Sequence, residues 1–252
     1  MMPLQISLPE HKNEGKHREG CFICGKELIY SEKAENQVCV ICGKEAESSI
    51  TCPDGHFVCD DCHRADAAEI IEILTARSEE TNPVKMAQEI MSTPAFNMHG
   101  PEHHLLVPAV LLACMRNLGI ETEPRQMRDA LFRAGKLPGG ICGSWGACGA
   151  AIGAGIALSV HRRLTALKKE GWGETNRDVG MILARVGAYG GPRCCKRSTY
   201  SALLAAMDIL EQDGVHFPEE GFAPPVCKDF WRNQQCLKEE CPYYPRKQGS
   251  EK

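Results

Sequence analysis

Residues 145–160 read WGACGAAIGAGIALSV, a stretch made almost entirely of small and apolar residues. We predict a helix here, in which Gly149 and Gly153, four positions apart, lie on one face. Each glycine lowers the stability of a helix by up to about 1 kcal/mol. We therefore expect that the missing side chains are needed to let another group lie close to this helix. Another backbone or a cofactor can approach this face, and both glycines are candidate cofactor-binding residues.

Helical patterns surround this stretch. Residues 64–94 predict connecting helices, one of them capped by Asn82. Residues 95–215 predict a central domain made only of helices, because apolar residues recur at helical spacing and no alternating strand pattern appears. One helix is expected over residues 101–119, with a kink at Pro108. The expected fold is therefore mainly α.

The N-terminal part carries metal-ligand spacing. Residues 1–20 are polar and predict a flexible N-terminus, whereas residues 21–63 hold seven cysteines and little apolar periodicity. Such a segment cannot bury enough surface to fold alone and needs metal as its core. Two short-spaced pairs complete one tetrahedral shell, so eight ligands suit two zinc ions. The four pairs are Cys21/Cys24, Cys39/Cys42, Cys52/His56 and Cys59/Cys62.

Two pairing schemes are open. A consecutive scheme gives the first two pairs to one ion and crowds the last two within eleven residues. An interleaved scheme, which we favour, joins the first pair to the third and the second to the fourth. Residues 39–62 resemble the first six ligands of a RING-type cross-brace, although the last pair of that pattern is absent downstream. The resemblance implies a RING-like or treble-clef zinc module, and we expect it to be structural or to bind a protein partner.

Three stretches carry candidate chemistry in the central domain: HGPEHH (99–104), GGICGSWGACGAAIGAG (139–155) and GGPRCCKR (190–197). Cys148 is expected in the first turn of the small-residue helix, where the helix dipole favours a thiolate. Cys194 and Cys195 are expected just before another helix, beside Lys196 and Arg197. We expect these two cations to keep both sulfurs ionised, and they are further candidate cofactor-binding residues.

Together, the three motifs resemble an uncharacterised cysteine-rich domain family of anaerobic archaea and bacteria, over residues 95–215. That family is sometimes joined to methyltransferase or radical-SAM modules, so the resemblance implies partnership with such a system. A weaker similarity, carried by residues 139–155, is to the C_GCAxxG_C_C family of redox proteins. This second similarity implies a redox or metal-binding role.

Two chemistries fit the candidate catalytic residues, which are Cys142, Cys148, Cys194, Cys195, His103 and His104. In the first, the four thiols ligate an iron–sulfur cluster, with His103 or His99 as an additional ligand. In the second, Cys148 or Cys195 attacks a substrate in thiol–disulfide or sulfur-transfer chemistry. A neighbouring thiol then resolves the intermediate, and His103 or His104 carries the proton.

Residues 216–252 predict a linker and a cysteine-rich metal-binding tail. Cys227, Cys236 and Cys241 are spaced like the first three ligands of a CCCH zinc finger, a class that binds single-stranded RNA. The histidine that such a finger needs is missing after Cys241, and His216 or an oxygen ligand could complete the shell. The tail's aromatic residues are expected to pack around the metal.

Composition limits the functional classes. The net charge is −4 and no long basic run appears, which argues against broad electrostatic attraction to nucleic acid. No signal-peptide core or membrane-length apolar run is present, so we expect a cytoplasmic protein whose 15 cysteines are metal ligands or reactive thiols. We therefore predict a metalloprotein that acts as a redox or sulfur-transfer enzyme or enzyme component. The alternative is a non-enzymatic zinc-dependent adaptor that binds protein or RNA.

Overall fold

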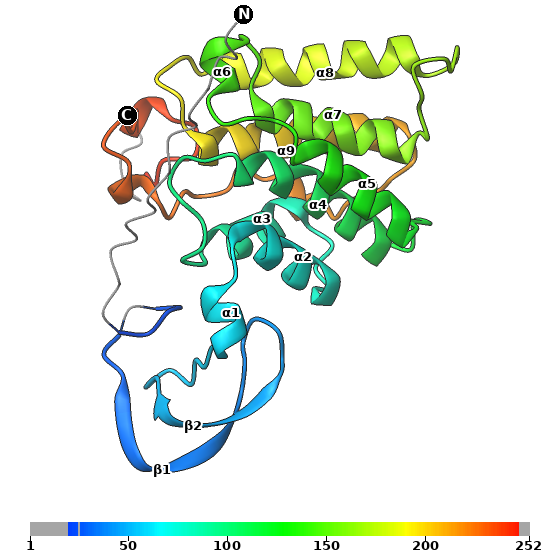
Figure 1. The fold of residues 1–252 in the computed structure, drawn as a ribbon. Helices are drawn as coiled ribbons and strands as arrows, with labels where there is room; N and C mark the ends of the chain where they lie inside the picture. The colour runs from blue at the N-terminus through cyan, green and yellow to red at the C-terminus, as the bar shows by residue number, and fades with distance from the viewer. Residues whose placement is uncertain (1–19, 25, 247–252) are drawn as a thin grey trace, which may run out of the picture.

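The computed structural model describes residues 20–24 and 26–246 (Figure 1). Within these residues it contains nine α-helices and one two-stranded sheet, which confirms the mainly α prediction. The flexible N-terminus predicted for residues 1–20 lies, except for Gly20, outside the described residues. None of the described helices combines the length and apolarity needed to cross a membrane.

The N-terminal module contains a β-hairpin that the sequence did not predict. Strand β1 (Ile29–Val38) pairs antiparallel with β2 (Glu45–Thr51), and the short helix α1 (Asp60–Arg64) follows. The loop between the strands is closed by the Cys39 N–H, which donates to the Lys44 carbonyl at 2.9 Å. Strand β1 is exposed along nearly its whole length. Apolar and polar residues alternate along a strand when one of its faces is buried. Because β1 has no buried face, its sequence does not show this alternation.

The connecting helices are α2 (Ala67–Arg77) and α3 (Pro83–Met91). The connecting helices predicted within residues 64–94 are present, and Asp66 caps the first of them, α2, by accepting N–H bonds from Ala68 and Glu69. Asn82 caps α3 as predicted, accepting from the N–H of Val84 at 2.9 Å. Arg77, at the end of α2, donates to the Ile41 carbonyl and so joins the helices to the N-terminal module.

The centre of the helical domain is α4 (Glu102–Asn117), which is buried from Leu106 to Met115. It packs against α2, α3, α5 (Pro124–Ala134), α7 (Gly149–His161) and α9 (Cys195–Gln212). Helix α8 (Trp172–Gly187) covers α7 and α9 from outside, and the short α6 (Ile141–Ser144) precedes α7 (Figure 1). Helix α5 was not among the helices named from the sequence, although Pro124 at its first position and the helical spacing of Met127, Ala130, Leu131 and Ala134 indicate one.

The closest packing lies between α4 and α7. A side chain at Gly153 would place its Cβ 2.6 Å from the His104 carbonyl oxygen, and one at Gly149 would place it 2.3 Å from the His104 ring. Pro108 has no N–H to donate to that carbonyl, and α7 covers it instead. At both glycines α4 makes the close approach, and Gly149 also lines the cavity described below. That the two glycines bind a cofactor stays a prediction.

The tail, residues 216–246, lies against α3 and the first turns of α9 (Figure 1). It is irregular apart from three 3-10 turns, at Glu219–Phe222, Phe230–Arg232 and Lys238–Glu240. The hydroxyl groups of Tyr243 and Ser201 hydrogen-bond at 3.0 Å. This contact fixes the end of the tail on α9.

The α4–α7 contact generates a test on stability. Gly153→Ala should lower the free energy of unfolding by about 1–3 kcal/mol, because the new methyl group would overlap the His104 carbonyl. Gly180→Ala is the matched control: this glycine lies on the exposed side of α8, and no atom lies within 4 Å of its added Cβ. Gly180→Ala should therefore raise stability by about 0.5–1 kcal/mol. Urea denaturation followed by circular dichroism measures both, and equal effects would contradict the contact.

Candidate metal centres and thiol cavity

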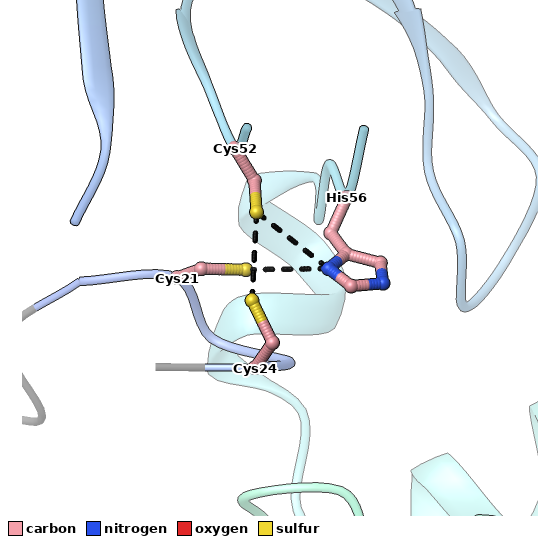
Figure 2. Close-up of side chains that lie close together, drawn as sticks. All are labelled: Cys21, Cys24, Cys52 and His56. Carbon is pink, nitrogen blue, oxygen red and sulfur yellow. Dashed lines mark hydrogen bonds between the residues drawn. The ribbon is translucent and has the colours of Figure 1, made fainter. Parts of the chain in front are cut away.

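The first candidate metal centre joins residues from both ends of the N-terminal module. Cys21, Cys24, Cys52 and His56 point at one common space (Figure 2), and their ligand atoms all lie within 4.8 Å of one another. The Cys24 and Cys52 sulfurs are 3.5 Å apart. The His56 Nδ1 lies 3.6 Å from the Cys52 sulfur and 3.8 Å from that of Cys21.

The second centre consists of Cys39, Cys42, Cys59 and Cys62, whose sulfurs also lie within 4.8 Å of one another. The Cys42 and Cys59 sulfurs are 3.6 Å apart. Cys39, Cys59 and Cys62 are buried. The two groups therefore follow the interleaved pairing, and the consecutive alternative is wrong.

Both groups have the dimensions of a single tetrahedral ion. Two thiolates bound at about 2.3 Å with a tetrahedral angle lie about 3.8 Å apart, and a thiolate and an imidazole nitrogen lie slightly closer. The observed separations of 3.5–3.8 Å match these values. A shell of four thiolates, or of three thiolates and one imidazole, suits zinc, and leaves no position open for a substrate.

Backbone N–H groups are aimed at the sulfurs. Ile23 N–H donates to the Cys21 sulfur and Asp54 N–H to the Cys52 sulfur, each at 3.4 Å. Burial opposes ionisation of Cys39, but backbone N–H donors, including that of Cys59, lower the pKa of its thiol to about 6. Cys39 thus favours the thiolate that a metal ligand requires, whereas burial raises the pKa values of Cys59 and Cys62 in the same group.

A separate cavity in the helical domain collects most of the predicted catalytic residues. It has a volume of about 290 Å³, and its lining includes Cys142, Cys148, Cys195, His103, His104 and Arg193. The cavity lies where three helices begin, since Cys148 is the N-cap of α7, Cys195 is the first residue of α9 and His103 lies in the first turn of α4. We call this space the thiol cavity.

The two histidines are neutral and differ in what they offer. Nδ1–H of His103 donates to the Gly100 carbonyl at 3.1 Å, so the Nε2 of His103 carries no proton and can accept a hydrogen bond. This Nε2 is buried and has no hydrogen-bond partner in the described part of the chain. Burial, and then the charge of Lys196, lower the pKa of His103 to about 3. Nδ1–H of His104 donates to the Leu137 carbonyl at 3.4 Å, and burial lowers its pKa as well. Neither ring holds a spare proton near neutral pH.

The prediction that Lys196 and Arg197 keep the neighbouring sulfurs ionised is wrong. Lys196 is fully buried and donates to the Met91 carbonyl at 3.2 Å, while Arg197 donates to the backbone carbonyl of Gly190 at 2.7 Å. Burial raises the pKa of Cys195 to about 11, although the Gly100 N–H and the charge of Arg193 act in the opposite direction. Arg193, which stands inside the GGPRCCKR motif, was not among the residues predicted from the sequence.

Cys194 does not share the cavity with Cys195. Burial raises its pKa, Arg197 opposes this, and the charge of Cys241 in the tail adds to it. The four-thiol set predicted from Cys142, Cys148, Cys194 and Cys195 is therefore divided between two places.

The predicted tail ligands do not have the mutual spacing of a single-ion site. In the part of the chain that the structure describes, the spacing of a single-ion site occurs only in the two N-terminal groups, so Cys227, Cys236 and Cys241 do not reach it. His216, a suggested fourth ligand, is exposed and pairs with Glu211 at 3.0 Å. His99, a suggested cluster ligand, has a buried Nδ1 without a hydrogen-bond partner among the described residues.

Most tail aromatics are packed within the protein. Tyr243 is buried, with its ring 5.3 Å from that of Tyr200, and Phe230 packs edge-on against Tyr244 at 5.1 Å. Trp231 is exposed. This arrangement leaves few rings available for stacking on RNA bases.

The comparisons with known proteins bear on the helical domain and the tail. The model of a family of unknown function, DUF5714, matches residues 70–244. The chain belongs to this family. The match agrees with the predicted resemblance to an uncharacterised family, but it is wider than residues 95–215 because it includes the tail cysteines. Both N-terminal metal groups lie outside it. No curated protein and no solved structure matches the chain.

The interleaved pairing can be tested by counting bound metal. Cys24→Ser and Cys52→Ser should each remove about one ion per chain, and the double variant should remove no more, because both residues serve one ion. Cys52→Ser combined with Cys62→Ser should remove about two ions. Native mass spectrometry of the full chain measures these stoichiometries. Consecutive pairing would reverse the results of the two double variants.

Proposed function

We propose that the protein is a thiol-dependent redox or sulfur-transfer enzyme that works in its thiol cavity, and that its N-terminal zinc module docks a protein partner. One observation carries the proposal: Cys148 and Cys195, from the starts of two different helices, line one cavity together with Arg193. Their charges interact, since that of Cys148 contributes to the raised pKa of Cys195. Such a pair has the form of an attacking thiol and a resolving thiol.

The two thiols have different roles because their surroundings differ. Both thiols are half-buried at the start of a helix, Cys148 as the N-cap of α7 and Cys195 as the first residue of α9. Cys195 has a pKa of about 11, raised by burial, so it is almost wholly protonated near neutral pH. We therefore assign the first attack to Cys148 and the resolving step to Cys195.

With a disulfide substrate the steps balance as thiol–disulfide exchange. Cys148 loses its proton to water and its thiolate attacks one substrate sulfur, forming a mixed disulfide and releasing a substrate thiolate. That thiolate takes the proton of Cys195, whose new charge is stabilised by Arg193 and the Gly100 N–H. The Cys195 thiolate then attacks the Cys148 sulfur, closing a protein disulfide and releasing the second substrate thiolate, which takes a proton from water.

The substrate disulfide thus gains two electrons, and an external thiol reductant must restore the protein. With a persulfide substrate, the same first attack moves the outer sulfur onto Cys148 and releases the substrate thiolate, which is sulfur transfer. His103 takes no proton in this scheme, because a pKa of about 3 makes it a weak base. It offers Nε2 as a hydrogen-bond acceptor to a bound guest.

The module's apolar surface supports docking of a protein. The hairpin and its surroundings expose several large apolar side chains: Ile29, Tyr30, Val38, Val40 and Ile50. Exposed apolar groups of this kind mark interaction surfaces when they gather together. A methyltransferase or radical-SAM partner and a cytoplasmic location remain predictions, as does the adaptor alternative.

Trapping of the mixed disulfide tests the assignment. When the reduced full chain is treated with glutathione disulfide, Cys195→Ser should accumulate a glutathione adduct on Cys148, because the resolving thiol is gone. Cys148→Ser should form no adduct on Cys195, whereas the exposed Cys142 can be modified in every variant. Peptide mass spectrometry locates the adducts, and Cys114, which is fully buried in the core, serves as an internal control that should stay unmodified. A Cys195→Ser chain without an adduct on Cys148 would contradict the proposal.

The pH dependence of alkylation gives an independent check on Cys195. Because its pKa of about 11 lies above the range tested, the thiolate fraction and the alkylation rate should rise about tenfold per unit between pH 7 and pH 9. Arg193→Gln should lower the rate at each pH, since a favourable charge is removed. Iodoacetamide labelling followed by mass spectrometry measures the rate, and a rate that is flat over this range would contradict the assigned role.

A further inference from the structure

The thiol cavity carries positive charge that no carboxylate of the described residues offsets. The described residues that line it include two arginines, Arg193 and Arg197, and no aspartate or glutamate. Several other arginines in the described part of the chain pair with carboxylates, but neither cavity arginine does. Arginine stays charged in proteins, so the cavity has two cations without acidic partners.

Arg197 is buried although it has no carboxylate partner among the described residues. Only 5% of it is exposed, and its Nη2 donates to the carbonyls of Gly190 and Pro192 at 2.7 and 3.0 Å. Its Nε and Nη1 have no hydrogen-bond partner in the described part of the chain, yet neither nitrogen is fully enclosed by the protein. A buried charge is costly without compensation. A guest with a negative group can accept hydrogen bonds from these donors and supply the compensating charge.

Arg193 lies at the opening of the cavity, because it belongs to the lining and is exposed to solvent. The helices α4, α7 and α9 all begin at this cavity, and the positive ends of their dipoles act in the same direction as the two arginines. Together these groups attract an anion from solution and hold it beside the two thiols.

The rest of the lining limits the size and polarity of the guest. Leu183 and Val186 of α8 and Ala150 of α7 give the cavity an apolar side. Its volume of about 290 Å³ is at the lower end of the range for small-molecule sites. A short aliphatic chain that ends in an anionic group matches both parts of the lining. A disulfide within a folded domain would have to bring its backbone into this space.

We propose that the substrates of the thiol cavity are small free disulfides or persulfides that carry an anionic group, and that Arg197 and Arg193 bind this group. This substrate class rests on the thiol chemistry proposed above for the same cavity. Arg197 is fixed by its two carbonyl contacts, so it orients the guest relative to Cys148 and Cys195. Arg193 attracts the guest at the opening. Both arginines bind the guest, and neither gives or takes a proton.

Three disulfides of equal chain length and different charge test the substrate class: dithiodipropionate is anionic, hydroxyethyl disulfide is neutral and cystamine is cationic. In the full-length Cys195→Ser chain, the Cys148 thiolate attacks one sulfur, keeps that half as a mixed disulfide and releases the other half as a thiolate. Peptide mass spectrometry measures the initial rate of this adduct. Each rate is divided by the rate of a reference cysteine peptide with the same disulfide. The relative rate with dithiodipropionate should be about tenfold above that with the neutral compound, and that with cystamine should be lower.

Replacement of either cavity arginine should reduce the preference for the anion. In the same Cys195→Ser chain, Arg193→Gln and Arg197→Gln should each lower the ratio of the anionic to the neutral rate. Arg125→Gln is the matched control, because it removes an exposed arginine of α5 that does not line the cavity, and it should leave the ratio unchanged. Arg197 also holds the Gly190 segment, so circular dichroism checks the fold of its variant. The charge series and Arg193→Gln do not depend on that variant.

The possible results distinguish the substrate class from the thiol chemistry itself. If none of the three disulfides modifies Cys148, the thiol chemistry is wrong and the substrate class fails with it. If all three react at equal relative rates, or cystamine reacts fastest, the thiol chemistry stands and the anionic class is wrong. A ratio that falls as much in Arg125→Gln as in Arg193→Gln would indicate a general effect of net charge and would overturn binding by the cavity arginines.

Discussion

The contact of α4 with α7 at Gly149 and Gly153 determines how the rest of the helical domain is arranged. The His104 ring occupies the space that a side chain at Gly149 would need, and the His104 carbonyl occupies the space at Gly153. Pro108 leaves that carbonyl without its helical donor, so α7 must cover it. The same contact brings the first turn of α4 next to the start of α7, which is where His103 and Cys148 meet in one cavity.

The paired cysteines of the GGPRCCKR motif can be understood from helix geometry. Cys194 is the extended N-cap residue of α9, and Cys195 is its first helical residue. Successive side chains around a helix differ in direction by about 100°, so two adjacent thiols cannot easily serve one small site. Cys195 accordingly lines the thiol cavity, whereas Cys194 does not.

Structural features that depend on neighbouring residues could be predicted from the sequence better than those that depend on contacts between distant residues. The ligand pairs of the N-terminal module could be recognised because gaps of two or three residues are set within one turn, and Asn82 capped its helix for the same reason. The hairpin could not be recognised, because β1 is exposed along nearly its whole length. Helix α5 was missed although its sequence carries the signals, with Pro124 at the first position and Met127, Ala130, Leu131 and Ala134 at helical spacing. The ionisation of Cys195 was mispredicted because charges adjacent in sequence were assumed to be adjacent in space. Lys196 is turned into the core instead, and burial then dominates the pKa of the thiol.

The two N-terminal metal centres are not equivalent in what they stabilise. Cys39, Cys59 and Cys62 belong to the same apolar cluster as the core of the helical domain, together with Ile41, whereas Cys21 and Cys52 do not. The carbonyl of Ile41 also accepts the Arg77 hydrogen bond from α2. Because a metal-dependent module folds with the free energy of metal binding, an ion in the all-cysteine centre would stabilise both the module and its attachment to the helices. An ion bound by Cys21, Cys24, Cys52 and His56 would instead order the outer part of the module, the part that carries the exposed apolar side chains of the hairpin. In the docking role proposed above, loss of this outer ion would therefore weaken partner binding without disturbing the thiol cavity.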